Sequence, residues 1–182
     1  MVYNVRGKSL KRLMNETEII QSNFLKAYDE YADALFRHCY FRVSSREVAL
    51  DLTQDIFTKT WEYLSQGKEV KNIKAFLFQV ARNIVIDYYR KHKSVSLDVE
   101  LENGVQFEDM HSETGARSEI SHMLSALEKL PEQYREILRL RYIDDLSVSE
   151  IAETIGEKEN AVSVRIHRGV EKLKEILHIH HE

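Results

Sequence analysis

The chain has 182 residues, is 43% hydrophobic and carries a formal net charge of -4 at pH 7. This apolar content is enough to build a packed core and excludes a chain that is disordered throughout. Six glycines, one proline and few alternating runs favour an almost entirely helical, all-α fold. The single cysteine, Cys39, excludes an internal disulfide and is expected to be a small core residue. No signal peptide and no apolar run of about 18 residues is found, so a soluble, cytoplasmic protein is expected.

The first helical pattern runs from Gln21 to Val43. Its apolar residues recur every three or four positions, which predicts one face of an amphipathic helix. The residues expected in the core are Phe24, Tyr28, Tyr31, Leu35 and Cys39.

A second helix is predicted from a cap at Ser44 or Ser45 to about Leu64. Val48, Leu52 and Ile56 line one side, and an acidic side is formed by Asp51, Asp55, Thr58 and Glu62, beside Gln54 and Trp61. This acidic side has the character of a docking surface, although spaced carboxylates on a helix often simply face water. A metal site or an acid–base pair at Asp51 and Asp55 is disfavoured, since no histidine or third carboxylate lies beside them at a ligand spacing.

A third helix is predicted from Ile73 to about Lys93, after a polar loop over Gln66–Asn72. The positions expected to face the core are Ile73, Phe76, Leu77, Val80 and Ile84. A second stripe contains Asn83, Asp87, Arg90 and Lys91, with Arg82, Tyr88, Tyr89 and Lys93 beside it. Cations interleaved with aromatic rings and an amide suit an unpaired nucleic-acid strand. Tyrosines on a helix also serve as half-buried packing residues, so this pattern alone leaves both interpretations open.

Helical periodicity lapses over residues 94–118, which predicts a linker between a domain at 1–93 and a domain at 119–182. A flexible segment of about 25 residues has a root-mean-square span of roughly 25–30 Å and a stretched limit of about 80–90 Å. Two helical turns of DNA, at about 34 Å each, lie within that limit. The two domains can therefore contact one duplex at separate places.

Charge is distributed unevenly over these segments. Residues 1–93 carry 16 Lys and Arg against 11 Asp and Glu, residues 94–118 carry 1 against 6, and residues 119–182 carry 9 against 13. Because neutralisation of phosphates supplies most non-specific affinity for DNA, this chain is expected to bind naked DNA poorly and to meet it with help from a larger partner.

The segment from Leu127 to Leu177 reads as a helix-turn-helix. Ser147 and Glu150 have the spacing of a capping box, and Gly156 can end the first helix in a left-handed conformation before a second helix begins after Lys158. Inward positions of the second helix are Val162, Ile166, Leu173 and Leu177, and the outward ones are Ser163, Val164, Arg165, His167 and Arg168. The outward set is expected to face a major groove, although an ordinary helical hairpin has the same capping signals.

Three histidines near the carboxyl end, His178, His180 and His181, raise the alternative of a metal protein or enzyme. They flank Ile179 on a fraying helix end and do not form a closed ligand set, which favours solvated side chains.

Together these segments resemble the bacterial RNA polymerase sigma factors of the extracytoplasmic-function group, which keep sigma regions 2 and 4 joined by a linker. Asp51–Phe57 with Trp61 resembles region 2.2, and Ala75–Arg90 resembles regions 2.3 and 2.4. The part that resembles region 4 comprises Leu130-Pro131, Arg135, Glu150–Ala152 and Val162–Leu173.

The resemblance implies two small helical domains, a region 2 bundle and a region 4 helix-turn-helix, that bind core RNA polymerase and direct promoter-specific initiation. The implied partners are the clamp helices of the largest polymerase subunit, the flap of the second subunit, promoter DNA and an anti-sigma factor. The implied polymerase-binding residues are Asp51, Gln54, Asp55 and Trp61. The residues implied to bind DNA at the minus-ten element, where a base is turned out of the stack, are Asn83, Asp87, Arg90 and Lys91. The residues implied to bind DNA at the minus-thirty-five element are Ser163, Val164, Arg165, His167 and Arg168.

The resemblance implies no covalent chemistry, cofactor or metal. The chain departs from the family where a hydroxyl cap and a Gly-Thr pair usually begin the reading helix, since Lys158, Asn160 and Ala161 stand there. The stretch up to about Met14 has no clear counterpart in the family and is expected to fray. The alternative function is a dimeric helix-turn-helix regulator that acts at an operator and needs only the carboxy-terminal domain.

Overall fold

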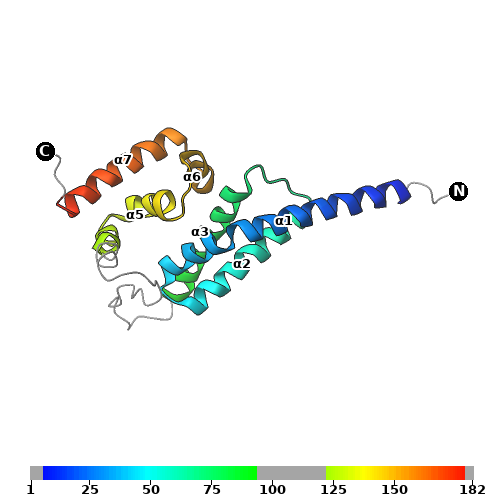
Figure 1. Ribbon diagram of the computed structural model, residues 1–182, viewed down its shortest axis with the longest axis horizontal. Coiled ribbons are helices and arrows are strands. Elements are labelled where there is room, and N and C mark those ends of the chain that lie inside the picture. Colours follow the sequence, from blue (N-terminus) through cyan, green and yellow to red (C-terminus); the bar gives the residue numbers. More distant parts are fainter. Residues whose placement is uncertain (1–5, 94–121, 179–182) are drawn as a thin grey trace.

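The computed structural model describes residues 6–93 and 122–178, which form helices joined by short turns (Figure 1). The helical elements are α1 (Arg6–Val43), α2 (Arg46–Ser65), α3 (Ile73–Lys93), a short helix at 122–128, α5 (Glu132–Leu138), the π-helical turn η1 (Arg139–Ile143), α6 (Val148–Ile155) and α7 (Glu159–Ile176). No strand occurs within the described ranges, and the predicted all-α class is confirmed. The predicted linker at 94–118 lies outside them.

Helices α1, α2 and α3 form the first packed unit, and α1 is longer than its apolar pattern predicts. It begins at Arg6, so the expectation of a frayed backbone up to Met14 is wrong for the part that the structure describes. Apart from Gly7, the segment between Arg6 and Gln21 is rich in residues that favour helix, which accounts for its helical backbone. This part of α1 extends away from the other helices (Figure 1).

The core of the first unit contains most of the predicted α1 positions. Leu35 and Cys39 are fully buried, and burial raises the pKa of the Cys39 thiol to about 11, as expected of a core residue. Tyr28 lies at the rim of this core and is 48% exposed, although its ring centroid is 4.6 Å from that of Phe57. The prediction that Tyr28 lies inside the core is therefore only partly right.

Helix α3 is buried on two sides. Leu77 and Ile84 are buried as predicted, but four further residues that the periodicity did not place in the core are buried too: Ala75, Phe78, Ala81 and Val85. The reason is that α3 packs against α1 and α2 and also against α6, which covers its other side. The single apolar stripe predicted for this helix therefore omits the side that packs against α6.

Helices α5, α6 and α7, with η1, form the second unit around a core of Ile137, Leu138, Leu140, Leu146, Ile151 and Val162. Helices α5 and α7 approach closely at Gly169. A Cβ atom at Gly169 would lie 3.2 Å from Cγ of Leu138, so the absence of a side chain there lets the two helices meet.

Candidate polymerase and nucleic-acid interfaces

The acidic side of α2 faces solvent. Ser45 caps the helix, because its Oγ accepts a hydrogen bond from the backbone N–H of Val48 at 3.4 Å. The side chains of Asp51, Gln54 and Asp55 are exposed on this helix. The arrangement presents three polar groups along a rigid, well-packed element, as a docking surface requires.

Trp61 differs from the other predicted polymerase-binding residues. It is half-buried, and its ring centroid lies 5.2 Å from that of Phe24 on α1. The indole thus packs against the core of the first unit and remains partly accessible to a partner. Such a partly exposed aromatic residue beside charged neighbours is a frequent anchor in protein interfaces.

The predicted stripe on α3 also lies at the surface. Asn83, Arg90 and Lys91 are exposed, and Asp87 is half-exposed. Asp87 and Arg90 form an ion pair, in which Oδ1 of Asp87 lies 3.0 Å from Nη2 of Arg90. This exposed ion pair lies on the same helix, one turn or more beyond Asn83.

Two tyrosines beside this stripe have partners of their own. The Tyr88 ring lies over the His92 ring, with centroids 4.1 Å apart. The Tyr89 hydroxyl donates a hydrogen bond to the backbone carbonyl of Arg42 on α1. Tyr89 therefore ties α3 to α1, and the packing interpretation of this tyrosine holds in the structure.

The helix-turn-helix forms at the predicted residues. The Ser147 backbone N–H donates to Oε2 of Glu150 at 2.7 Å, and Oγ of Ser147 accepts from the Glu150 N–H at 3.2 Å, which completes a capping box. Gly156 ends α6 with φ 71°, in the left-handed region. Lys158 precedes α7 in an extended conformation without a side-chain hydrogen bond to cap it. The capping box and the glycine turn are thus confirmed.

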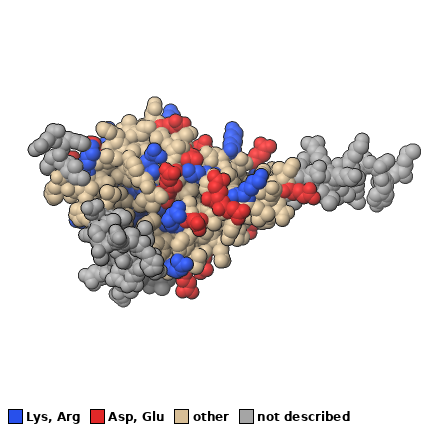
Figure 2. Space-filling view, in the orientation of Figure 1, with Lys and Arg blue, Asp and Glu red and all other residues tan. Residues whose placement is uncertain are grey.

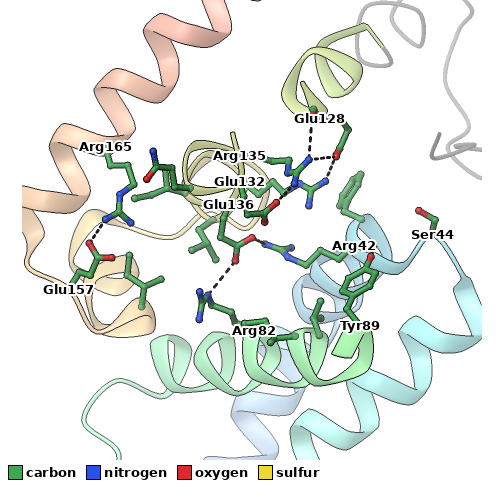
Figure 3. Close-up of a pocket in the computed structure, with 18 residues that line it drawn as sticks. Arg42, Ser44, Arg82, Tyr89, Glu128, Glu132, Arg135, Glu136, Glu157 and Arg165 are labelled. Atoms are coloured by element: carbon green, nitrogen blue, oxygen red, sulfur yellow. Dashed lines mark hydrogen bonds and ion pairs between the residues drawn. The ribbon is translucent and has the colours of Figure 1, made fainter. Parts of the chain in front are cut away.

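The outer face of α7 carries four of the five predicted reading residues. Val162 is fully buried, whereas Ser163, Val164, His167 and Arg168 are exposed. Arg165 is half-buried and pairs with Glu157 in the turn before α7, at 2.6 Å. Figure 3 shows Arg165 directed at Glu157, so the structure groups this arginine with the turn and not with the other four.

Comparison with known families matches both units. Residues 27–95 match the family described as Sigma-70 region 2, and residues 122–173 match the family described as Sigma-70, region 4. The extracytoplasmic-function RNA polymerase sigma factor SigW of Bacillus subtilis is 30% identical over 179 residues, which cover 92% of this chain and 95% of that protein. The chain belongs to the extracytoplasmic-function group of RNA polymerase sigma factors. We accordingly call the α1–α3 unit region 2 and the unit from residue 122 onward region 4.

A second relative of this sigma factor and one solved structure agree. The extracytoplasmic-function sigma factor BldN of Streptomyces coelicolor is 29% identical over 180 residues, or 91% of this chain and 66% of that protein. The sigma factor RpoE of Bartonella quintana, solved in complex with the anti-sigma factor NepR, has a TM-score of 0.69 at 23% identity and covers 87% of this chain and 99% of that one. The structural likeness extends over both regions and supports the fold.

Region 2 and region 4 of this sigma factor contact each other through a buried polar network. Nδ1 of His38 on α1 lies 2.8 Å from Oδ2 of Asp144, which directly follows η1 in region 4. Arg42, one turn further along α1, donates to the same Asp144 oxygen at 3.4 Å and to Oε2 of Glu136 on α5 at 3.3 Å. Arg82 on α3 approaches the other Glu136 oxygen at 3.7 Å. No predicted site residue belongs to this network.

The protonation states in the network follow from burial and charge. Burial and the adjacent Arg42 lower the pKa of His38, whose ring packs edge-on against Phe78. Burial alone would raise the pKa of Asp144, but His38 and Arg42 hold it below its usual range. We therefore assign a neutral His38 that donates its Nδ1–H to an ionised Asp144. Nε2 of His38 has no hydrogen-bond partner within the described residues, and a proton there would add an unsatisfied buried donor.

A second polar contact joins the start of α3 to the helix-turn-helix. Nζ of Lys74 donates to the backbone carbonyl of Asp145 at 2.8 Å and lies 3.3 Å from Oε2 of Glu150. Asp145 has φ 52°, a left-handed conformation that Asp tolerates. The Thr154 hydroxyl donates to the carbonyl of Ala75 at 3.2 Å. Glu150 thus completes the capping box of α6 and binds region 2 with the same carboxylate oxygen.

A cavity of about 750 Å³ opens between the two regions beside this network (Figure 3). Its walls carry cations and carboxylates from both regions, including Arg42, Arg82, Arg135, Glu128 and Glu136. Figure 3 shows Arg42 and Arg82 directed at Glu136, and Arg135 directed at Glu128 and Glu132. The contact between the two regions is therefore charged and incompletely packed, as contacts between domains of one chain commonly are.

The described residues contain no group of three or more His, Cys, Asp or Glu side chains that could hold a metal ion. Of the carboxy-terminal histidines, His178 is exposed, while His180 and His181 lie outside the described residues. No helix among those described is long and apolar enough to cross a membrane.

Proposed function

We propose that this sigma factor binds core RNA polymerase and directs it to start transcription at a particular set of promoters. The observation that carries this proposal is the position of three exposed polar faces, on α2, α3 and α7, at the residues that resemble the functional segments of the family. The proposed division is region 2 at residues 1–93, a linker at 94–118 and region 4 at 119–182. Sigma factors in general are not enzymes, and we propose that this chain too performs no covalent chemistry.

The α2 face is the proposed polymerase-binding surface. Asp51, Gln54 and Asp55 supply exposed polar groups, and Trp61 supplies a fixed aromatic edge. The proposed partner is the pair of clamp helices of the largest polymerase subunit, and region 4 is proposed to bind the flap of the second subunit. Charges at such a surface steer association and fix the register of the two proteins.

The α3 face is the proposed minus-ten surface. Asn83, with Asp87, Arg90 and Lys91, is available to a non-template strand whose bases have left the duplex stack. Turning a base out costs a few kcal/mol, which the protein must return through hydrogen bonds and stacking. This face is proposed to stabilise the open bubble once polymerase has bound.

The α7 face is the proposed minus-thirty-five surface. Arg168 and His167, with Ser163 and Val164, are exposed along a helix that follows a helix-turn-helix turn, the geometry that docks in a major groove. Arg165 belongs to the proposed surface as well, and its pair with Glu157 has to open before it reaches DNA.

An anti-sigma factor is a proposed further partner. The solved sigma factor from Bartonella quintana that this chain resembles was crystallised with its anti-sigma factor NepR. The proposed function also requires the cytoplasm, where polymerase meets the chromosome.

The test is transcription of pooled genomic fragments by purified core polymerase with and without this chain, followed by sequencing of the RNA 5′ ends. The proposal expects discrete start sites that appear only when the chain is present. A dimeric operator-binding regulator would give no such start sites and would instead bind a palindromic fragment without polymerase. Background starts alone would overturn the proposal.

A further inference from the structure

The contact between region 2 and region 4 has a consistent polarity. In each pair the cation belongs to region 2 and the anion to region 4: Lys74 with Glu150, Arg82 with Glu136, and Arg42 with Asp144 and Glu136. Over the sequence, residues 1–93 have more Lys and Arg than Asp and Glu, and residues 119–182 have the reverse. The acidic character of region 4 is unexpected for a domain that meets DNA, and this contact gives those carboxylates a function.

The charged contacts are local and not a general feature of the surface. On the face drawn in Figure 2, Lys and Arg residues are interspersed with Asp and Glu residues, without a large area of one sign. We define the clasp as the region 2 cations Arg42, Lys74 and Arg82 together with the region 4 carboxylates Glu136, Asp144 and Glu150. In the clasp, unlike the drawn face, each sign comes from one region only.

Burial makes the centre of the clasp specific. The side chains of Arg42 and Asp144 are only 5% and 1% exposed, and His38 is fully buried beside them. Buried ion pairs add little net stability compared with apolar residues, but removal of one partner is costly because it leaves a buried charge unpaired. This part of the clasp therefore fixes one relative position of the two regions.

The clasp occupies groups beside the proposed minus-ten surface. Lys74 is the second residue of α3, after the loop over residues 66–72, and Arg82 precedes Asn83 in the chain. Region 4 neutralises both cations, which would otherwise be available to phosphates. While the clasp is closed, region 4 also remains against α3 and does not reach an upstream element about two helical turns away.

We propose that the free sigma factor adopts a closed state in which the acidic face of region 4 masks the cationic side of region 2, and that opening of the clasp precedes promoter binding. That the closed state blocks promoter binding rests on the proposed function, whereas the closed state itself is a property of the free chain. Polymerase and promoter DNA stabilise the open state only to the extent that they bind it more tightly than the closed one.

The experiment uses the full chain labelled for single-molecule energy transfer through S65C on α2 and N160C at the start of α7, both exposed positions. Cys39 is fully buried and stays unlabelled. Asp144→Asn is the test variant, because the side-chain partners of Asp144, His38 and Arg42, both lie in region 2. Glu153→Gln is the matched control, since it removes one negative charge from an exposed position of α6.

Unaltered protein at low salt is expected to show a predominantly high-transfer population that salt reduces, because screening weakens the exposed pairs. In Asp144→Asn, most molecules are expected to show low transfer. The affinity of this variant for a single-stranded minus-ten oligonucleotide is expected to rise about fivefold or more. Glu153→Gln is expected to match the unaltered chain in both measurements. Glu136→Gln, with unchanged helix content by circular dichroism, serves as a second test variant and is expected to act in the same direction.

Three results would overturn the closed state or its role: low transfer in the unaltered chain, high transfer in both test variants, or opening without any gain in oligonucleotide affinity. The transcription assay separates this proposal from the function on which it rests. An open free chain that still directs specific initiation would reject the clasp alone, and a closed chain that yields no specific start sites would reject the proposed function alone.

Discussion

His38 and Asp144 lie 106 positions apart in the sequence, yet Nδ1 of the first is 2.8 Å from Oδ2 of the second, in the interior of the protein. The π-helical turn η1 brings this about. Its wider hydrogen-bonding pattern ends with the Asp144 N–H bonded to the carbonyl of Arg139, which sets Asp144 at the end of the turn and facing α1. One irregular turn thereby joins region 4 to region 2.

Acid is expected to open this contact. Burial and Arg42 lower the pKa of His38 in the closed state, opposed by Asp144 and Glu136, whereas an exposed histidine has a pKa near 6.5. The open state therefore binds a proton more readily, and the closed state loses stability as the pH falls below about 6.5. Asp144, whose pKa is also lowered, stays ionised through this window and does not reverse the effect.

The measurement is the closed fraction of the doubly labelled chain between pH 7.5 and 5.5, at constant ionic strength. Unaltered protein should open progressively toward the acid end. His38→Asn retains an N–H donor for Asp144 and does not titrate in this range, so its closed fraction should change much less with pH. A pH profile of His38→Asn identical to that of the unaltered chain would assign the effect to other groups.

Local signals account for what the sequence predicted correctly. Ser45, Ser147 and Gly156 each act on groups within about one helical turn, so the cap and turn residues identify the ends of α2 and α6 without knowledge of the rest of the chain. The exposed positions on α2 and α7 likewise follow from helical spacing once those ends are known.

Contacts between distant segments account for what the sequence did not predict. The second buried side of α3, where the Ala75 carbonyl accepts from the Thr154 hydroxyl, exists because α6 packs there. His38 reads as one more position of α1, and nothing near it in the sequence indicates that Asp144 will be its partner. Arg165 fits the outward face of α7 by spacing, yet Glu157 draws it aside.

Charge reversal on α2 is expected to weaken polymerase binding. Replacement of Asp51 and Asp55 by Lys changes two exposed carboxylates, and it should reduce the binding free energy for core polymerase by about 2 kcal/mol. Helix content should not change, because both side chains face solvent. Fluorescence anisotropy with labelled protein measures the affinity, and the double replacement of Asp29 and Asp33 by Lys, at exposed positions of α1, controls for the same change in net charge. Equal affinities of the α2 variant and the unaltered protein would remove the docking surface from α2.

Asn83 is expected to act at the melted strand. Asn83→Ala should lower the affinity of the polymerase complex for a single-stranded minus-ten oligonucleotide by about 1–3 kcal/mol, the usual value of a base-specific contact. The buried side of α3 does not include Asn83, so the thermal stability of the protein should stay the same. The oligonucleotide isolates strand capture from binding at the upstream element. An undiminished affinity combined with slower bubble formation on duplex promoters would assign Asn83 a role in melting only.

The turn between α6 and α7 is expected to need glycine for its backbone and not for space. Gly156 has φ 71°, and no atom lies within 4 Å of the position that a Cβ would take. Gly156→Ala should therefore reduce the free energy of unfolding of region 4 by about 1–2 kcal/mol, while Gly156→Asn should cost less, because Asn tolerates the left-handed region. Chemical denaturation followed by circular dichroism compares them.

Arg168 is expected to contact the upstream promoter element, and the form of that contact can be resolved by two substitutions. Arg168→Ala should reduce affinity by about 1–3 kcal/mol if the guanidinium bridges a guanine edge. Arg168→Lys keeps the charge but loses the planar pair of donors. If Arg168 contacts a phosphate, this variant should retain most of the affinity. If Arg168 contacts a base, this variant should lose most of the discrimination between promoter variants. Competition among promoter variants changed at single upstream positions, with polymerase bound, measures both affinity and discrimination. Because Arg168 is exposed on α7 and lies outside the clasp, unchanged affinity and unchanged discrimination in both variants would exclude this side chain from the reading face.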